Sequence, residues 1–130
     1  MSQNTQADNS SEPRPFDVKL SFAARRLQDL LISGFEGGVG YWCRISSVSP
    51  PHLAGVSYSK IPFFPSGMLL LRDTIEGKDL SLNREALQAG LALMCLKYPR
   101  HFARFVTEDE DAETGDVFIQ CCVFGEIRYG

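Results

Sequence analysis

Few features of this sequence belong to a membrane-spanning, secreted or nucleic-acid-binding protein. No apolar run approaches the roughly 20 residues of a transmembrane helix, and residues 1–15 hold no apolar stretch of the signal-peptide kind. Lysine and arginine number 13 against 16 aspartates and glutamates, which gives a formal net charge of −3. A general nucleic-acid binder needs clustered basic residues. We therefore expect a cytoplasmic protein that does not enter a membrane and does not bind nucleic acid directly.

Cysteine and histidine are scarce and lack the spacing of a metal site. The four cysteines are Cys43, Cys95, Cys121 and Cys122. No C-x-x-C pattern occurs, the two histidines stand apart, and the acidic residues do not follow the EF-hand pattern. We expect reduced thiols on buried, apolar faces, and we expect neither a metal nor another cofactor.

The composition suits one domain behind a short tail. With 130 residues, of which 44% are apolar, the chain is long enough for one hydrophobic core. Residues 1–15 are rich in serine, asparagine and glutamine and contain Pro13 and Pro15, so we expect a disordered tail there. Residues 16–130 are then expected to form a single α+β domain.

The hydrophobic pattern of this domain predicts a mainly antiparallel sheet of three to four strands, packed with three to four helices. Residues 16–22 alternate between apolar and polar, which predicts a strand; a helix that begins at Phe16 is the alternative. Further strands are predicted at residues 39–45, 56–64 and 68–75, with a turn at residues 76–79. Helices are predicted at residues 23–34, 83–98, 101–106 and from 114 onward, with Asn83 and Thr114 as N-caps and Gly34 as a C-terminal stop.

Residues 34–43 are the most unusual stretch, because four glycines, one carboxylate, three aromatic residues and a thiol fall within ten positions. We predict a helix-to-strand turn in which Gly37 and Gly38 adopt φ values that alanine disfavours. A carboxylate at a helix C-terminus opposes the helix dipole, so we expect Glu36 either to bind a partner or to have a basic neighbour. The candidate neighbours are Arg25, Arg26 and Arg44.

Two pairs of residues are further candidates for a binding site. Tyr41 and Trp42 would face opposite sides of a strand, one in the core and one near the surface. The exposed ring would then either seal a sheet edge or contact a partner. Arg100 and His101 lie at the start of a predicted helix, where His101 is either a surface or capping group or a general base paired with an acid such as Glu36.

An acidic run is the remaining candidate, with six carboxylates in residues 108–116. The run begins with Glu108, Asp109, Glu110 and Asp111. One interpretation is a solvated loop that places negative charge at the N-terminus of the last helix. The other is a surface that imitates phosphates and so attracts the basic groove of a partner.

Two segments carry a resemblance to known proteins: FEGGVGYWC, and KYPRHFARFVTEDEDAETGDVFIQCCVFGEIRYG. Together they resemble small uncharacterised bacteriophage and prophage accessory proteins, which have an EGG-x-x-YW turn and a C-terminal helix with an acidic-T-x-D pattern. The similarity covers roughly residues 22–42 and 82–130. It implies an accessory role carried by a phage, including interference with a host defence system. It supplies no catalytic residue.

Two hypotheses of function follow, and the first is favoured over an enzyme. The first is a non-enzymatic protein that binds a host macromolecule through residues 34–42 and the acidic run. The second is a small-ligand or nucleotide binder, or a minor hydrolase, that uses the glycine turn and His101. A flat aromatic and acidic surface would favour the first, and a concave pocket that joins the glycine turn to His101 would favour the second.

Overall fold

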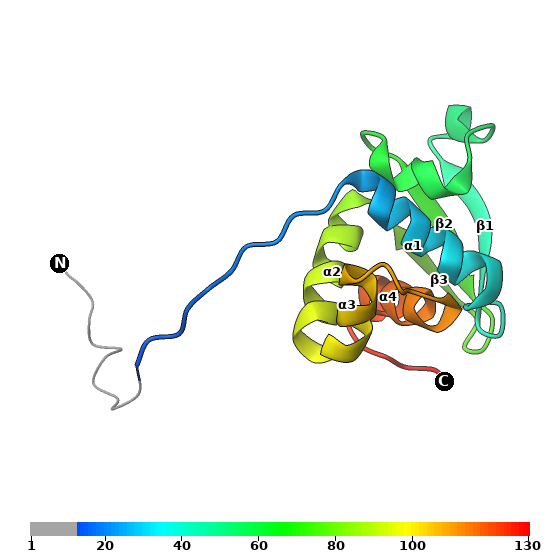
Figure 1. Ribbon diagram of the computed structural model, residues 1–130. Coiled ribbons are helices and arrows are strands. Elements are labelled where there is room, and N and C mark those ends of the chain that lie inside the picture. Colours follow the sequence, from blue (N-terminus) through cyan, green and yellow to red (C-terminus); the bar gives the residue numbers. More distant parts are fainter. Residues whose placement is uncertain (1–12) are drawn as a thin grey trace.

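In the computed structural model, which describes residues 13–130, four α-helices pack against a three-stranded antiparallel sheet (Figure 1). The α-helices are α1 (Ala24–Gly37), α2 (Arg84–Lys97), α3 (Pro99–Val106) and α4 (Ala112–Phe124). The strands are β1 (Cys43–Ser49), β2 (Met68–Asp73) and β3 (Lys78–Leu82), and two 3-10 helices, η2 (Pro51–Leu53) and η3 (Tyr58–Phe63), lie between β1 and β2. This confirms the predicted α+β class, with a strand count at the lower end of the prediction. Most of the predicted tail, residues 1–12, lies outside the described residues.

The sheet is a meander in the order β1-β2-β3, but its strands differ from those predicted. The predicted strand at residues 56–64 is not formed, and the segment contains η3 instead. Pro62, which has no backbone N–H to donate to a ladder, lies inside η3. The third strand is β3, whose first two residues, Lys78 and Asp79, belong to the predicted turn at residues 76–79. The actual turn comes earlier, because Asp73 Oδ1 accepts the backbone N–H groups of Ile75 and Glu76, and Gly77 has a φ of +70°. Residues 78–82 are therefore free to pair with β2.

The first helix is longer than predicted, and the first strand begins later. Gly34 does not end α1, which continues to Gly37. The four residues after Gly38 form a turn in which the N–H groups of Trp42 and Cys43 both donate to the carbonyl of Val39. β1 therefore begins at Cys43, opposite Asp73 of β2.

Neither prediction for residues 16–22 is correct. The segment has no regular secondary structure, and α1 begins only at Ala24. Figure 1 shows it running away from the helices and the sheet. Phe16 is 99% exposed, whereas the ring of Phe22 packs against Phe102 and Phe105 of α3. Within residues 13–130 no strand pairs with this segment, so its alternating apolar and polar residues do not belong to a sheet.

The helix caps show which residues begin the last two long helices. Asn83 caps α2 as predicted, since its side-chain oxygen accepts the N–H of Ala86 at 2.9 Å. The cap of α4 is Asp111 instead of the predicted Thr114, because the backbone N–H and the hydroxyl of Thr114 both donate to Asp111 Oδ1. This shift moves the helix start three residues upstream and turns Asp116 inward, where it is 8% exposed.

The hydrophobic core lies between α4, α1, α2 and the sheet. Every residue of α4 from Thr114 to Cys121 is buried, so this helix is the centre of the fold. The fully buried side chains around it include Leu30, Leu71 and Phe118. No helix among the described residues has the length and apolar character needed to cross a membrane.

Candidate functional site

A buried carboxylate, Asp116, joins the turn after α1 to α4. Its Oδ2 accepts the hydroxyl of Tyr41 at 2.6 Å, and its Oδ1 accepts the indole N–H of Trp42 at 2.8 Å. Gln120, one turn further along α4, also donates to Oδ1, at 2.9 Å. Trp42 is fully buried and Tyr41 is 50% exposed, which confirms the prediction of one core and one surface ring. The two rings nevertheless lie in a turn, not on a strand, and their polar atoms meet on one carboxylate.

Gln120 also fixes the C-terminal segment. Its side-chain oxygen accepts the N–H groups of Arg128 and Tyr129 at 2.6 and 2.9 Å, and its amide donates to the carbonyl of Tyr129 at 3.0 Å. The Tyr129 ring packs at 5.6 Å from that of Trp42, and its hydroxyl donates to Asp73 Oδ2 of β2 at 2.8 Å. The two segments that carry the resemblance are thus connected through Asp116 and Gln120.

The electrostatics of this network keep its tyrosines neutral. Burial raises the pKa of Tyr41 to about 12, and its hydrogen bond to Asp116 and the charge of that carboxylate act in the same direction. Burial and the nearby Asp73 likewise raise the pKa of Tyr129 to about 12. Burial opposes ionisation of Asp73, but hydrogen bonds from the Glu76 backbone and the Tyr129 hydroxyl hold its pKa below the ordinary value. Both phenols therefore act as donors to carboxylates at physiological pH.

A hollow of about 370 Å³ opens beside this network, and it joins Gly37 and Gly38 to His101. Its polar lining consists of Tyr41, His101, Glu113, Asp116 and Tyr129. His101 Nδ1 is buried and has no hydrogen-bond partner among the described residues. This first hollow contains two carboxylates and two phenols, and neither lysine nor arginine lines it.

A second hollow, of about 550 Å³, adjoins the first. It is lined by Arg100, His101, Ala103, Arg104 and Glu113, so the two hollows share His101 and Glu113. Arg100 and Glu113 are exposed, and Arg104 pairs with Asp111 at 3.2 Å. One hollow is therefore lined by carboxylates and the other mainly by arginine.

The structure places Glu36 away from both hollows. Its Oε2 accepts the hydroxyl of Tyr58 at 2.7 Å, in a separate depression that also includes Val39. Burial, followed by this hydrogen bond, raises the pKa of Tyr58. Within residues 13–130 Glu36 forms no ion pair with the basic residues predicted as its neighbours. Arg26 pairs with Glu110 instead, and Arg44 lines the same depression as Glu36 without an ion pair to it. Glu36 and His101 do not share a hollow.

Neither of the two central glycines has a positive φ, and only Gly38 is closely packed. Gly38, the C-cap, has a φ of −110°, and Gly37 is helical, so the prediction that they need φ values unsuited to alanine is wrong. A Cβ on Gly38 would lie 2.4 Å from the carbonyl oxygen of Ala112, whereas a Cβ on Gly37 would meet only the Ala112 Cβ at 3.5 Å. Only Gly38 is therefore required by its surroundings.

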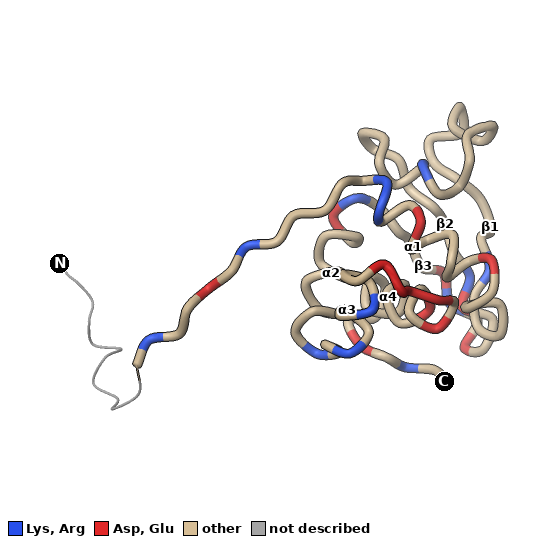
Figure 2. The backbone as a smooth tube through the Cα atoms, viewed as in Figure 1, with Lys and Arg blue, Asp and Glu red and all other residues tan. Residues whose placement is uncertain are grey.

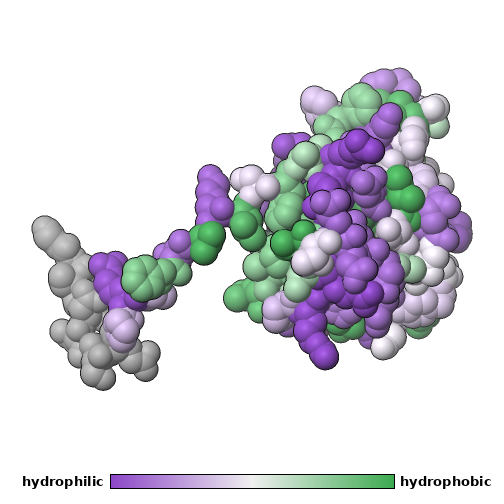
Figure 3. Space-filling model, in the orientation of Figure 1, coloured by the Kyte–Doolittle hydropathy of each residue, from purple (hydrophilic) through white to green (hydrophobic). Residues whose placement is uncertain are grey.

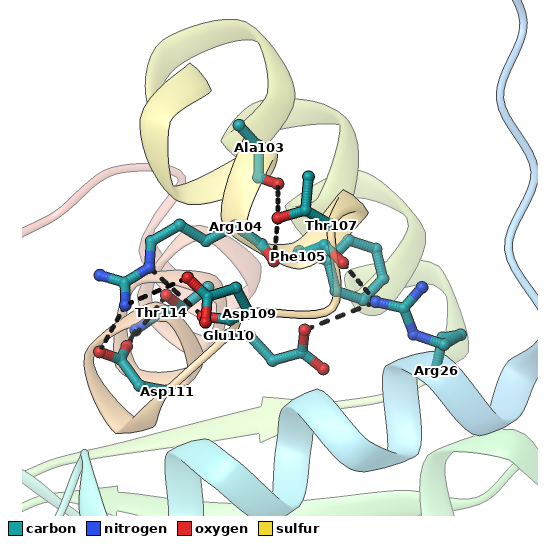
Figure 4. Close-up of polar contacts among 9 residues, drawn as sticks. All are labelled: Arg26, Ala103, Arg104, Phe105, Thr107, Asp109, Glu110, Asp111 and Thr114. Carbon is teal, nitrogen blue, oxygen red and sulfur yellow. Dashed lines mark hydrogen bonds and ion pairs between the residues drawn. The ribbon is translucent and has the colours of Figure 1, made fainter.

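Figure 2 shows the acidic residues along the loop between α3 and α4, and their carboxylates differ in their partners. Glu110 pairs with Arg26 of α1 at 3.5 Å, and the same guanidinium donates to the carbonyl of Phe105, as Figure 4 shows. Hydrogen bonds from Thr114, together with Arg104, hold the pKa of Asp111 below its ordinary value. Glu108 and Asp109 stay exposed, the Asp109 side chain by 79%.

Sequence reasoning missed three members of the network: Asp73, Gln120 and Tyr129. The available signal was Gln120, a lone amide within the apolar run V-F-I-Q-C-C. A buried amide needs partners for its oxygen and its nitrogen, so its position in a buried stripe indicates a polar network. The expectation that Cys95 is buried is also wrong, since this side chain is exposed, while Cys43 and Cys121 are buried.

Comparisons with known proteins assign neither a family nor a function to this chain. No family model matches the sequence, and neither a curated protein nor a solved structure matches the chain. Over residues 13–130, no three histidine, cysteine, aspartate or glutamate side chains are grouped so that they could hold a metal ion.

Proposed function

We propose that the chain is a non-enzymatic protein of the bacterial cytoplasm that binds a host macromolecule through the two adjoining hollows. The observation that carries the proposal is that these hollows share His101 and Glu113 but differ in charge. Two open depressions side by side suit an extended partner better than a compact ligand. Side-by-side patches of opposite charge also fix the orientation and register of a partner.

Each hollow suits a different chemical group on that partner. In the first, the half-exposed Tyr41 ring, Glu113 and Asp116 favour a cation such as a lysine or arginine side chain, through cation–π and charge-assisted contacts. In the second, the exposed guanidinium of Arg100 favours a carboxylate or phosphate. The partner surface would therefore carry a basic group next to an acidic one.

The thiols and His101 support binding over catalysis. Burial raises the pKa of Cys43 to about 12 and that of Cys121 to about 11, so both are protonated and weakly nucleophilic at neutral pH. No carboxylate in the described part of the chain orients His101 through Nδ1, as an activated general base requires. The favoured function is therefore recognition.

The resemblance to phage and prophage accessory proteins suggests the class of partner. That partner is a host protein, and components of a defence system belong to this class. A patch that imitates phosphates would need several exposed carboxylates without partners in the fold, and the acidic run offers few of them. Glu110 pairs with Arg26, and Asp111 caps α4 and pairs with Arg104 although it stays exposed. Glu108 and Asp109 are exposed as well. We therefore place recognition at the hollows, with Glu108 and Asp109 at its edge.

A small-ligand binder is the second candidate, because the first hollow does join the glycine turn to His101. Its volume of about 370 Å³ is at the lower end of the range of small-molecule pockets. The ligand would be a compact cation, for the same reasons of charge. A thermal-shift screen with free amines, amino acids and nucleotides tests this candidate, and a rise in Tm with an amine would favour it over the macromolecule.

Affinity capture from a bacterial lysate, followed by mass spectrometry and by calorimetry with the purified partner, tests the first candidate. Glu113→Gln and Arg100→Ala each change one exposed side chain of a hollow, and Glu36→Gln is the matched control outside both. We expect the wild type and Glu36→Gln to bind the same partner with equal affinity and the other two variants to bind it more weakly. Equal affinity for all four proteins would contradict the proposal.

A further inference from the structure

Residues 16–20, which precede α1, have the alternating pattern of a strand but pair with no strand among residues 13–130. Phe16, Val18 and Leu20 are 99, 84 and 55% exposed, and they alternate with Asp17 and Lys19. Figure 3 shows hydrophobic and hydrophilic residues alternating along the segment that leaves the body in Figure 1. Burial of an apolar side chain of this size contributes about 1.5–3 kcal/mol, so this exposure favours a partner that covers it.

The sequence of the segment is complementary to itself. Residues 16–20 read Phe-Asp-Val-Lys-Leu, with apolar residues at both ends and the centre and opposite charges between them. In an antiparallel pair with Val18 on a two-fold axis, Phe16 faces Leu20 of the second copy and Val18 faces Val18. Asp17 then faces Lys19 of the second copy, and symmetry makes this pair occur twice. Opposite charges and apolar pairs directly across two strands are both stabilising.

A partly apolar groove beside the segment provides a surface on which a two-stranded ribbon can pack. An isolated pair of strands is marginally stable in water unless it packs on a hydrophobic surface. A hollow of about 350 Å³ lies between this segment and the first two turns of α1 and α2. Its apolar lining includes Leu20, Leu27, Phe63, Leu87 and Leu91, and its polar lining consists of Lys19, Ser21, Arg84 and Gln88. Leu20 belongs to both features, so the register above brings Phe16 of the second copy to the edge of the groove.

We propose that two copies of this chain associate through residues 16–20, which pair antiparallel about Val18 and insert Phe16 of each copy toward the groove of the other. The occupant of the groove is thus a second copy of the chain. The interface is isologous and closes on itself, so association stops at the dimer. Strand pairing between copies explains why a segment with strand periodicity has no strand partner among residues 13–130 of its own chain.

Sedimentation equilibrium on the full chain, with a set of charge variants, tests this register. Asp17→Lys puts lysine opposite Lys19 twice in the dimer, and we expect the dimer Kd to rise roughly tenfold or more. Lys19→Asp makes the corresponding acidic clash. The double variant Asp17→Lys/Lys19→Asp restores opposite charges, and its Kd should return to near the wild-type value. Val18→Asp places two carboxylates on the axis and should abolish the dimer.

Asp29→Lys is the matched control, because it makes the same change of charge at an exposed position of α1 outside the pairing segment. It should leave the dimer Kd unchanged. All of these side chains are exposed or partly exposed in one chain, so circular dichroism and Tm should stay close to wild type and show that each variant is folded. A wild type that remains monomeric up to roughly 1 mM would overturn the proposal. So would a Val18→Asp dimer as stable as the wild type, or a double variant as weak as Asp17→Lys.

Discussion

Gly34 of α1 and Gly115 of α4 lie in direct backbone contact where the two helices cross. A Cβ on Gly34 would lie 2.5 Å from Ile119 Cδ1 and 2.9 Å from the carbonyl of Gly115. A Cβ on Gly115 would lie 2.3 Å from the backbone nitrogen of Gly34. This close approach brings the turn after α1 onto α4, and it therefore sets the distance between Tyr41 and Asp116.

Gly34→Ala and Gly115→Ala should both destabilise the fold. The clash at Gly115 is with backbone, which has no rotamer to change, so the helices must separate. Overpacking of this kind costs about 1–3 kcal/mol or more, and we expect Gly115→Ala at the upper end. Urea unfolding measures the loss. Gly55→Ala is the control, since a Cβ there meets nothing within 4 Å, and a loss at Gly115 no larger than this control's would contradict the close packing.

Asp116→Ala and Asp116→Asn should separate the structural from the electrostatic role of this carboxylate. Alanine leaves the buried indole N–H of Trp42 without an acceptor, which should cost about 3 kcal/mol in unfolding free energy. Asparagine can keep that bond through its amide oxygen, so we expect a loss of about 1 kcal/mol.

The same Asp116→Asn variant should lower the pKa of Tyr41 from its value of about 12 toward the ordinary value of 10. The effect of burial remains, whereas the negative charge and the carboxylate acceptor are removed. Ultraviolet titration of tyrosinate measures the shift, and Tyr41→Phe identifies which transition belongs to Tyr41. An unchanged Tyr41 transition in Asp116→Asn would show that the carboxylate does not govern this phenol.

Local patterns predicted the parts of the fold that local interactions decide. The cap Asn83 and the strand β2 are examples. The cap is a contact across three residues, and the apolar run of β2 places Leu69 and Leu71 in the core. Residues 56–64 have strand-like composition but contain η3, while the K-D-L-S-L of β3 pairs with β2. The strand propensity of a segment does not determine whether the segment joins a sheet, because that depends on pairing with other parts of the chain.

The candidate site was hidden by one error in the position of a cap. With Thr114 as the predicted N-cap, Asp116 belongs to the exposed acidic start of the last helix. With Asp111 as the actual cap, Asp116 is in the second turn and points to the core, where it meets Trp42 and Gln120. A shift of three residues in the predicted helix start thus decides whether Asp116 is interpreted as a surface charge or as the centre of the network.

The four cysteines should differ sharply in reactivity. Cys95 is exposed, whereas burial raises the pKa of Cys43, Cys121 and Cys122 above the ordinary value. A thiol reagent at about pH 8 should modify one cysteine quickly in the native protein and the other three only as fast as the protein unfolds. Cys95→Ser should remove the fast phase completely. A fast thiol that remains in this variant would contradict the protection of Cys43 and Cys121, which are buried, and of Cys122, which is partly buried.

The cap of α4 should give the protein an acid-sensitive part of its stability. Hydrogen bonds from Thr114, aided by Arg104, hold the pKa of Asp111 below the ordinary value of 3.8. For a carboxyl whose pKa is lowered by folding, the stabilisation is fully present above the unfolded pKa and is lost as the pH falls through the folded pKa. The advantage of the wild type over Asp111→Asn should therefore shrink as the pH is lowered below about 4.

Asp111→Ala completes this comparison. Alanine cannot cap, so it should cost about 1 kcal/mol relative to asparagine, and this difference should stay constant with pH because neither residue titrates. Urea unfolding of the three proteins at about pH 7, 5 and 3 measures both differences. A wild-type advantage over Asp111→Asn that is the same at all three pH values would show that the ionised carboxylate adds nothing to the cap, and that the neutral hydrogen bond to Thr114 alone begins the helix.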